Sequence, residues 1–164
     1  MQQSRLDSVH RPTIALPPME RAKSEGEPVT EPPEGRLSVE LVGPRVVLRE
    51  PRLDDAPALL AAFGDPEVVR YMAIPVQTLE TEQQYLKSAM AEAQRNPRRE
   101  FHLAVALRAS GAVIGMARIS ISSVEHLRGD VGYGIRRDLW NRGYTTEALT
   151  CLVNLASRSW ACGA

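Results

Sequence analysis

The sequence lacks a surplus of either charge, because its 164 residues contain 20 basic and 20 acidic side chains. Proteins that bind nucleic acid or an anionic membrane surface usually carry a basic excess, so we expect neither partner. No apolar run approaches the roughly 18 residues that a membrane-spanning helix needs. The first residues, Met1 to Asp7, lack the apolar core of a signal peptide, and we therefore expect a cytoplasmic protein.

Cysteine is also scarce. The two cysteines, Cys151 and Cys162, lie 11 residues apart, which leaves one disulfide open but favours reduced thiols in a cytosolic protein. No spacing of cysteine and histidine matches that of a zinc site, so we expect no metal centre.

Residues 1–40 differ in composition from the remainder of the chain. They hold six of the twelve prolines and several acidic residues, and no hydrophobic period persists along them. A segment of this kind does not bury enough apolar surface to become ordered. The composition predicts a disordered tail over 1–40, followed by one domain over 41–164.

Periodicity and capping residues predict four helices in this domain. Asp54 or Asp55 offers an N-cap, and the helices are expected over 56–63, from 66 onward, from Thr78 through Asn96, and over 145–160. In the third helix, Leu79, Leu86, Met90 and Ala93 form the predicted apolar stripe.

Strands are predicted over 45–49, 101–107, 112–121 and 130–136. A turn at 109–111 joins the second and third of them as a hairpin. The order of strand, helices, three antiparallel strands and helix indicates an α+β fold with a central sheet flanked by helices.

Residues 138–149 carry the strongest functional signal. They indicate a strand that runs through a tight turn at Gly143 into a helix, where unpaired N–H groups point together at the positive end of the helix dipole. Such a turn suits a phosphate or a pyrophosphate. The preceding strand contains Gly132 and Gly134, and glycines inside a strand usually mark a bulge or a close approach by another group.

Three motifs together resemble the GNAT superfamily of acetyl-CoA-dependent N-acetyltransferases. They are the segments 41–51, beginning Leu-Val-Gly-Pro-Arg; 63–72, Phe-Gly-Asp-Pro-Glu-Val-Val-Arg-Tyr-Met; and 130–149, which contains Asp-Val-Gly-Tyr and Trp-Asn-Arg-Gly-Tyr-Thr-Thr-Glu-Ala-Leu. The branch that includes ribosomal-protein N-terminal alanine acetyltransferases is the most similar. The resemblance covers about residues 41–164 and implies the GNAT fold, acetyl-CoA as cofactor and a primary amine as acceptor.

The resemblance also implies which residues hold acetyl-CoA. The strand would bind the pantetheine arm along its backbone, and the turn would bind the pyrophosphate; the residues are Val131, Gly132, Tyr133, Gly134 and Ile135, followed by Arg142, Gly143, Tyr144, Thr145 and Thr146. An ordinary strand with one bulge, and a threonine that only caps a helix, remain alternatives. Asn141 and Thr145 depart from the family pattern, where glycine or another small residue is usual.

Asp130 occupies the position where this branch often has glutamate, and it is the candidate general base for the amine proton. A charge at a strand edge or an Asx-turn is the alternative. By the resemblance, Arg70 and Tyr71 fall where related enzymes border the acceptor pocket; a plain amphipathic helix end is the alternative, and the residues alone favour it slightly. We expect His102 to be a packed or surface residue and Glu147 to be structural.

The family continues beyond the point where this sequence stops, with another strand, a helix and two further strands. Two interpretations follow. The chain is a C-terminally incomplete N-acetyltransferase, in which a primary amine of a small molecule or a protein N-terminus attacks the thioester directly. Alternatively, it is a non-catalytic CoA-binding module whose sheet is completed by a partner, either a second copy or another chain.

Overall fold

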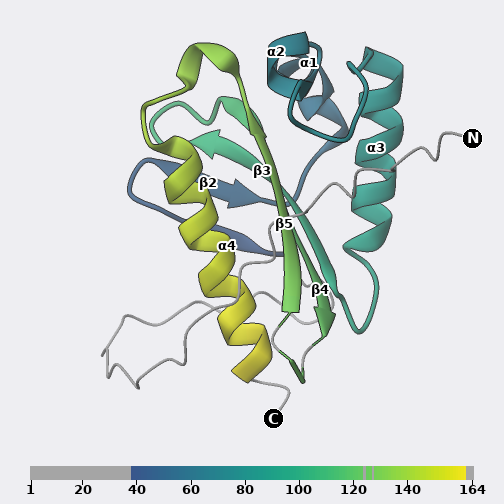
Figure 1. The fold of residues 1–164 in the computed structure, drawn as a ribbon, viewed down its shortest axis with the longest axis vertical. Helices are drawn as coiled ribbons and strands as arrows, with labels where there is room; N and C mark the ends of the chain where they lie inside the picture. Colours follow the sequence, from purple (N-terminus) through teal and green to yellow (C-terminus); the bar gives the residue numbers. More distant parts are fainter. Residues whose placement is uncertain (1–37, 124, 127, 162–164) are drawn as a thin grey trace, which may run out of the picture.

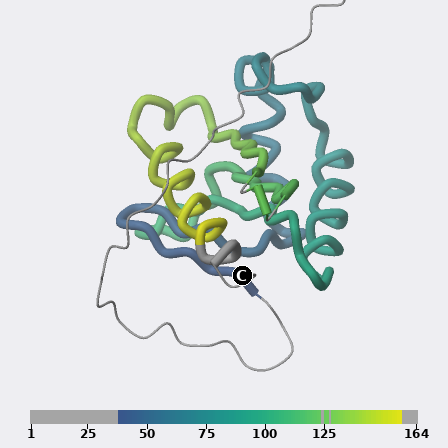
Figure 2. Tube along the Cα trace, turned by 60° about the horizontal axis from the view of Figure 1, so that its bottom comes forward, coloured from purple at the N-terminus to yellow at the C-terminus, as the bar shows by residue number. Residues whose placement is uncertain are grey.

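The computed structural model describes residues 38–161 except 124 and 127. It contains one antiparallel sheet in the order β1-β2-β3-β4-β5, with α4 on one face and α1, α2 and α3 on the other (Figure 1). The same two-sided arrangement is seen in the turned view of Figure 2. Most of the predicted tail, residues 1–37, lies outside the described residues, as does Cys162, whereas Cys151 is half-buried on α4.

The five strands pair in sequence order, each antiparallel to its neighbour. They are β1 (Glu40–Val42), β2 (Val46–Arg49), β3 (Glu100–Leu107), β4 (Val113–Ser123) and β5 (Arg128–Ile135). The predicted hairpin and the strand after it are confirmed. The sequence did not predict β1, because three residues are too few to establish an alternating pattern.

The helices also follow the prediction, with two short additions. They are η1 (Leu53–Asp55), α1 (Ala56–Phe63), α2 (Pro66–Val69), α3 (Leu79–Glu92), η2 (Arg137–Leu139) and α4 (Tyr144–Ala161). Asp65 caps α2 by accepting the N–H of Glu67, and Thr78 caps α3 by accepting the N–H of Thr81. None of the helices in the described part is long and apolar enough to cross a membrane.

Two hydrophobic cores lie on the two faces of the sheet. The first joins the sheet to α4 and includes Leu48, Leu103 and Leu152, which are fully buried. The second joins the sheet to α1, α2 and α3, and it is built around Leu59, Leu86, Met116 and their neighbours. Burial of apolar surface on both faces fixes which side chains of each strand point to which layer.

The predicted stripe on α3 is partly wrong. Leu86 and Ala93 are buried, but Leu79 and Met90 are each about 40 % exposed. The core face instead passes through Glu82, Leu86 and Ala89, so a carboxylate occupies a position where the sequence pattern required an apolar residue. The helix also stops at Glu92 rather than Asn96, because the next turns close with the tighter i to i+3 bonds Gln94 N to Ala91 O and Arg95 N to Glu92 O.

The sequence offered Asp54 or Asp55 as the N-cap of the first helix. In the structure the side chain of Asp55 does not cap α1. Its carboxylate instead accepts two hydrogen bonds from the Arg49 guanidinium, at 2.8 and 2.9 Å, and one from the N–H of Arg52, at 2.7 Å. Burial alone would raise the pKa of this carboxyl, but these donors hold it below its ordinary value. The ion pair ties the start of α1 to β2.

Candidate functional site

The predicted turn between β5 and α4 has the backbone that an anion site needs. Asn141 and Gly143 adopt φ values of 59° and 80°, the left-handed region that asparagine and glycine tolerate best. Helix α4 begins at Tyr144, and the N–H of Glu147 donates to Gly143 O at 3.1 Å. The N–H groups of residues 144–146 precede that bond and therefore lack intrahelical acceptors.

Neither predicted threonine is the N-cap of α4. Thr145 and Thr146 already lie inside the first helical turn, and the residue before the helix is Gly143. The conformation also explains the departure of Asn141 from the family pattern: the position needs a positive φ, which glycine supplies most easily and asparagine also accepts.

Arg45 braces this turn, and sequence reasoning did not identify it. Its guanidinium donates to Arg142 O at 2.9 Å, pairs with Glu147 at 3.0 Å and stacks over the ring of Tyr144 at 4.8 Å. A Cβ at Gly143 would lie 3.2 Å from Nη2 of Arg45. The φ value therefore requires glycine here, whereas Arg45 would need to shift only slightly to accept a Cβ.

Glu147 is structural, as expected. Its carboxylate accepts the backbone N–H groups of Arg45 and Val46, the latter at 2.9 Å, and thereby fastens α4 to the turn between β1 and β2. These bonds hold its pKa below the ordinary value, although burial acts in the opposite direction. A Cβ at Gly43 would come within 2.8 Å of this carboxylate. The first and third motifs of the family resemblance are thus in direct contact.

A hollow of about 480 Å³ lies beside the start of α4. It is lined by Pro44, Arg45, Leu107, Arg108, Ala109 and Tyr144. Two arginines and the aromatic ring of Tyr144, the first residue of α4, therefore border this hollow, and arginine favours a phosphate-bearing ligand. Across the described ranges, no group of three or more histidine, cysteine, aspartate or glutamate side chains could hold a metal ion.

Strand β5 lies at the edge of the sheet and pairs only with β4 within the described residues. Arg136 N donates to Ile114 O, and hydrogen-bonded positions alternate along antiparallel strands. The backbones of Asp130, Gly132 and Gly134 are therefore directed toward β4. Those of Val131, Tyr133 and Ile135 are directed to the free edge, where Ile135 O accepts the indole N–H of Trp140 at 2.7 Å. An extended ligand could pair with the remaining groups.

The two glycines of β5 occupy different environments. A Cβ at Gly134 would overlap Cε1 of Phe63 and lie 2.9 Å from Cζ, so this close approach belongs to a buried ring of α1. A Cβ at Gly132 would have one neighbour outside its own strand segment within 4 Å, Nε of Arg118 at 3.7 Å. The sheet is covered at Gly134 and open at Gly132.

Asp130 projects from the same face as Gly132 and Gly134, because side chains alternate along a strand. It is partly exposed, and its carboxylate has no hydrogen-bond or ion-pair partner among the described residues.

Arg70 and Tyr71 follow α2, which packs against β5. Both side chains are exposed; Arg70 pairs with Glu67 at 3.5 Å, and its guanidinium lies 5.4 Å from the ring of Tyr71.

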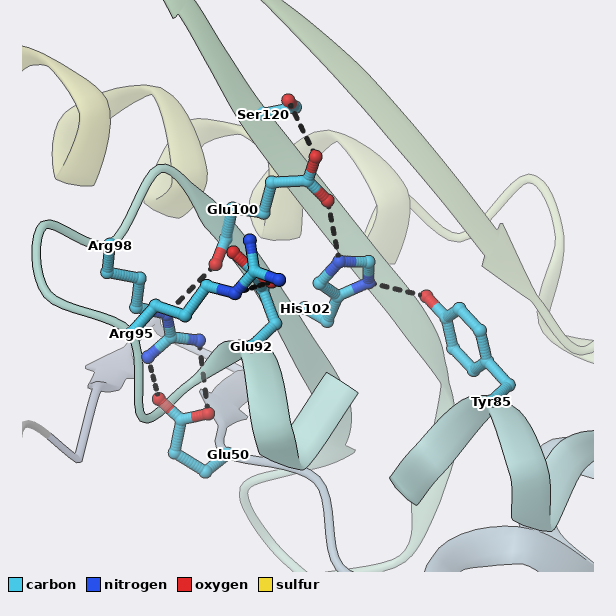
Figure 3. Close-up of polar contacts among 8 residues, drawn as sticks. All are labelled: Glu50, Tyr85, Glu92, Arg95, Arg98, Glu100, His102 and Ser120. Atoms are coloured by element: carbon cyan, nitrogen blue, oxygen red, sulfur yellow. Dashed lines mark hydrogen bonds and ion pairs between the residues drawn. The ribbon is translucent and has the colours of Figure 1, made fainter. Parts of the chain in front are cut away.

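A chain of polar contacts joins β4 and β3 to α3 on the same side of the sheet (Figure 3). Ser120 donates to Glu100 at 3.3 Å, Glu100 contacts Nε2 of His102 at 3.1 Å, and Nδ1 of His102 contacts the hydroxyl of Tyr85 at 2.7 Å. Burial lowers the pKa of His102, and its contact with Glu100 lowers the pKa of that carboxyl. The neutral imidazole then donates through Nε2 to Glu100 and accepts the Tyr85 hydroxyl at Nδ1. His102 is packed, as expected.

The chain is similar to proteins of one family. Its residues 45–161 match the acetyltransferase (GNAT) domain model. An uncharacterized N-acetyltransferase, p20 of Bacillus licheniformis, is 28 % identical over 114 residues, which are 67 % of this chain and 61 % of the relative. A second relative, YoaA of Bacillus subtilis, is covered over 62 % of its length, so the chain spans less than two thirds of either.

Solved structures share the fold at low identity. An acetyltransferase of the GNAT family from Bacillus anthracis superposes with a TM-score of 0.64 at 18 % identity, over 74 % of this chain and 68 % of that one. The microcin C7 self-immunity acetyltransferase MccE, in complex with acetyl-CoA and AMP, gives 0.58 at 17 %, over 71 % and 64 %. The ribosomal L7/L12 α-N-protein acetyltransferase RimL gives 0.61 at 15 %, over 77 % and 70 %.

The antiparallel sheet with α4 on one face and three helices on the other is the α+β fold of these structures. The family model extends from Arg45, which braces the turn, to the last residue of α4. The chain therefore belongs to the GNAT acetyltransferase family.

Proposed function

We propose that this chain carries the acetyl-CoA site and the catalytic face of a cytoplasmic N-acetyltransferase that acetylates a primary amine. One observation carries the proposal. The free edge of β5 is followed, after the short helix η2, by a turn whose N–H groups lack intrahelical acceptors, so successive segments offer backbone donors for an extended arm and for a phosphate. The complex of MccE with acetyl-CoA supports this choice of cofactor.

The assignments along β5 follow from which groups point outward. Val131 and Tyr133 would pair with the pantetheine arm, and the N–H of Ile135 would complete that edge. The backbones of Gly132 and Gly134 pair with β4, so neither would bind the arm through its own N–H or C=O. Gly132 would act through the absence of a side chain, whereas the space beside Gly134 is filled by Phe63 and its role would be to hold the strand in place. In the turn, residues 142–146 would hold the pyrophosphate, with Arg45 fixing their conformation.

Acetyl-CoA supplies an activated acyl group as a thioester. The acceptor amine must be neutral to attack it, and Asp130 is the group that would take the amine proton, directly or through water. A C–N bond forms and the C–S bond breaks, giving the N-acetyl product and a thiolate that gains a proton to become CoA. No covalent intermediate with the protein is needed.

The finer assignments belong to the same proposal. The motif resemblance and the shared fold of RimL support the ribosomal-protein branch, with a protein N-terminus or a small amine as acceptor. Arg70 and Tyr71 would border that acceptor. A homodimer or another chain that pairs with the free edge of β5 would be the protein partner, and neither nucleic acid nor membrane is expected.

Calorimetric titration with acetyl-CoA tests the proposal. Because Gly143 requires its positive φ, a substitution there would distort the turn, and Arg142→Glu is the sharper probe. The Arg142 side chain is exposed, so reversing its charge should leave the fold intact. Arg137→Glu is the matched control: it makes the same charge change on an exposed arginine five residues away.

We expect saturable binding by the unsubstituted chain, at least tenfold weaker binding by Arg142→Glu, and little change in Arg137→Glu. Equal loss in both variants would show that only overall charge matters. Absence of binding by a folded chain would reject an acetyl-CoA site in these residues. Binding without acetyl transfer to any amine would favour the CoA-binding module.

A further inference from the structure

Arg118 of β4 is a cation that makes no ion pair within the described residues although, after the hydrogen bond from His102, its charge helps to lower the pKa of Glu100. It lies between His102 of β3 and Gly132 of β5 in the strand register. Its Nε lies 3.7 Å from where a Cβ of Gly132 would be, so the side chain reaches over the edge strand. In the part of the chain that the structure describes, its guanidinium makes no hydrogen bond and no ion pair.

The neighbours of Arg118 explain why its donors remain available. Glu100 is the nearest carboxylate on β3, but one of its oxygens accepts from Ser120 and the other from His102. Burial lowers the pKa of His102, and both of its ring nitrogens contact other partners, Tyr85 and Glu100. The hydrogen-bond network of this face is therefore satisfied without Arg118, although arginine normally uses its planar fork on a carboxylate or phosphate.

Asp130 complements this unpaired cation. Ser120 stands opposite Asp130, and Gly132 stands opposite Arg118, so the two charged residues occupy diagonal positions on neighbouring strands and the same face. Side chains in such positions start roughly 7–8 Å apart. They do not pair with each other. One free carboxylate and one free guanidinium thus flank the uncovered backbone of Gly132.

We propose that the acceptor is a primary amine that carries its own carboxylate within a few bonds. Arg118 receives that carboxylate through two parallel N–H donors, and this orients the amine toward Asp130 and the edge of β5. The inference rests on the proposed function and specifies its substrate class. Two sources offer the same chemistry: the α-carboxylate of a free amino acid, and the side-chain carboxylate of an N-terminal aspartate or glutamate in a peptide.

Nuclear magnetic resonance of the arginine Nε–Hε groups tests this without requiring turnover. The Arg118 signal is the one that disappears in Arg118→Gln. The first pair of probes is L-alanine and L-alaninamide, and the second is a C-terminally amidated tripeptide beginning with aspartate and its asparagine counterpart. Each is titrated into the full chain, with and without acetyl-CoA.

We expect the carboxylate-bearing member of one pair to shift the Arg118 signal saturably, at least tenfold more tightly than its amide and than acetate. The pair that responds identifies the source of the carboxylate. Arg118→Gln should lose this binding, measured by calorimetry, and Arg118→Lys should retain only part of it, because lysine keeps the charge without the fork. Arg128→Gln, on an exposed arginine of β5, should bind the probe unchanged.

Equal response to the acid and amide of both pairs, or no response in either cofactor state, would overturn the proposal. Failure of the acetyl-CoA site remains distinguishable, because cofactor binding is measured separately and Arg118→Gln should leave it unaffected. Loss of acetyl-CoA binding with intact carboxylate recognition would reject the proposed function alone.

Discussion

Gly132 and Gly134 lie on the same face of β5 but differ in how the strand is packed around them. Gly134 lies beneath the ring of Phe63, and its absent side chain makes room for α1. Gly132, two residues earlier on the same face, has only Arg118 beside it. The part of β5 around Gly134, its closed end, is held against the helices. The part around Gly132, its open end, leaves the backbone, the Asp130 carboxylate and the Arg118 guanidinium accessible. Glycine is therefore required by the core at Gly134 and is not required by packing at Gly132.

The largest effect is expected at the closed end. Gly134→Ala places a methyl group against Phe63 and should destabilise the domain by about 1–3 kcal/mol, the usual cost of overpacking a core. Chemical denaturation measures the free energy of unfolding. The double variant with Phe63→Leu should recover part of the loss, because a smaller side chain leaves room for the methyl group. If Gly134→Ala is as stable as the parent, the ring moves freely and the closed end is not tightly packed.

The sequence predicted β5 and the helices that pack against the sheet, but it did not predict that Gly132 and Gly134 differ in their surroundings. Asp65, Pro66 and Thr78 mark helix starts by local chemistry, and the structure confirms them. Gly132 and Gly134 have the same local signature, and only the position of Phe63, 71 residues away along the chain, separates them. Long-range contacts of this kind leave no periodic signal.

The same limit applies to the candidate site. The turn at Gly143 was evident from its glycine and the helix that follows, whereas Arg45 was not identified, because nothing near it in the sequence shows that it packs on a turn almost 100 residues later. Glu82 shows another limit: the stripe of this helix was predicted from its apolar residues alone, so a carboxylate on the core face was not identified.

A smaller effect is expected from Glu82, the one carboxylate on the core face of α3. It is 2 % exposed, and its Oε2 has no partner. Burial raises its pKa, so the folded state holds the proton more tightly than the unfolded chain. Its cost is therefore absent below the unfolded pKa and grows as the pH rises through the folded pKa. Glu82→Gln should stabilise the domain at pH 8 by about 1 kcal/mol, with little gain at pH 4.

Thermal unfolding at several pH values measures this difference. Glu80→Gln is the matched control, because Glu80 is exposed two residues earlier on the same helix and should show no pH-dependent gain. A gain for Glu82→Gln that is equal at pH 4 and pH 8 would mean that ionisation of Glu82 costs nothing. The core beneath α3 would then tolerate a buried charge, and Gly134 and Gly132 would differ in packing alone.

The smallest effect on stability is expected at the open end, where Gly132→Ala tests the comparison most directly. The added methyl group meets only Nε of Arg118 at 3.7 Å, an ordinary contact, and Gly132 does not have a positive φ. Replacing glycine by alanine restricts the unfolded chain, so stability should stay within about 1 kcal/mol of the parent or rise slightly.

The methyl group of Gly132→Ala should nevertheless occupy the surface between Arg118 and Asp130 and weaken carboxylate recognition severalfold. Acetyl-CoA binding should be retained, because the backbone groups that point outward belong to Val131 and Tyr133. A destabilisation equal to that of Gly134→Ala would show that both ends of β5 are packed and would remove the open surface from the site.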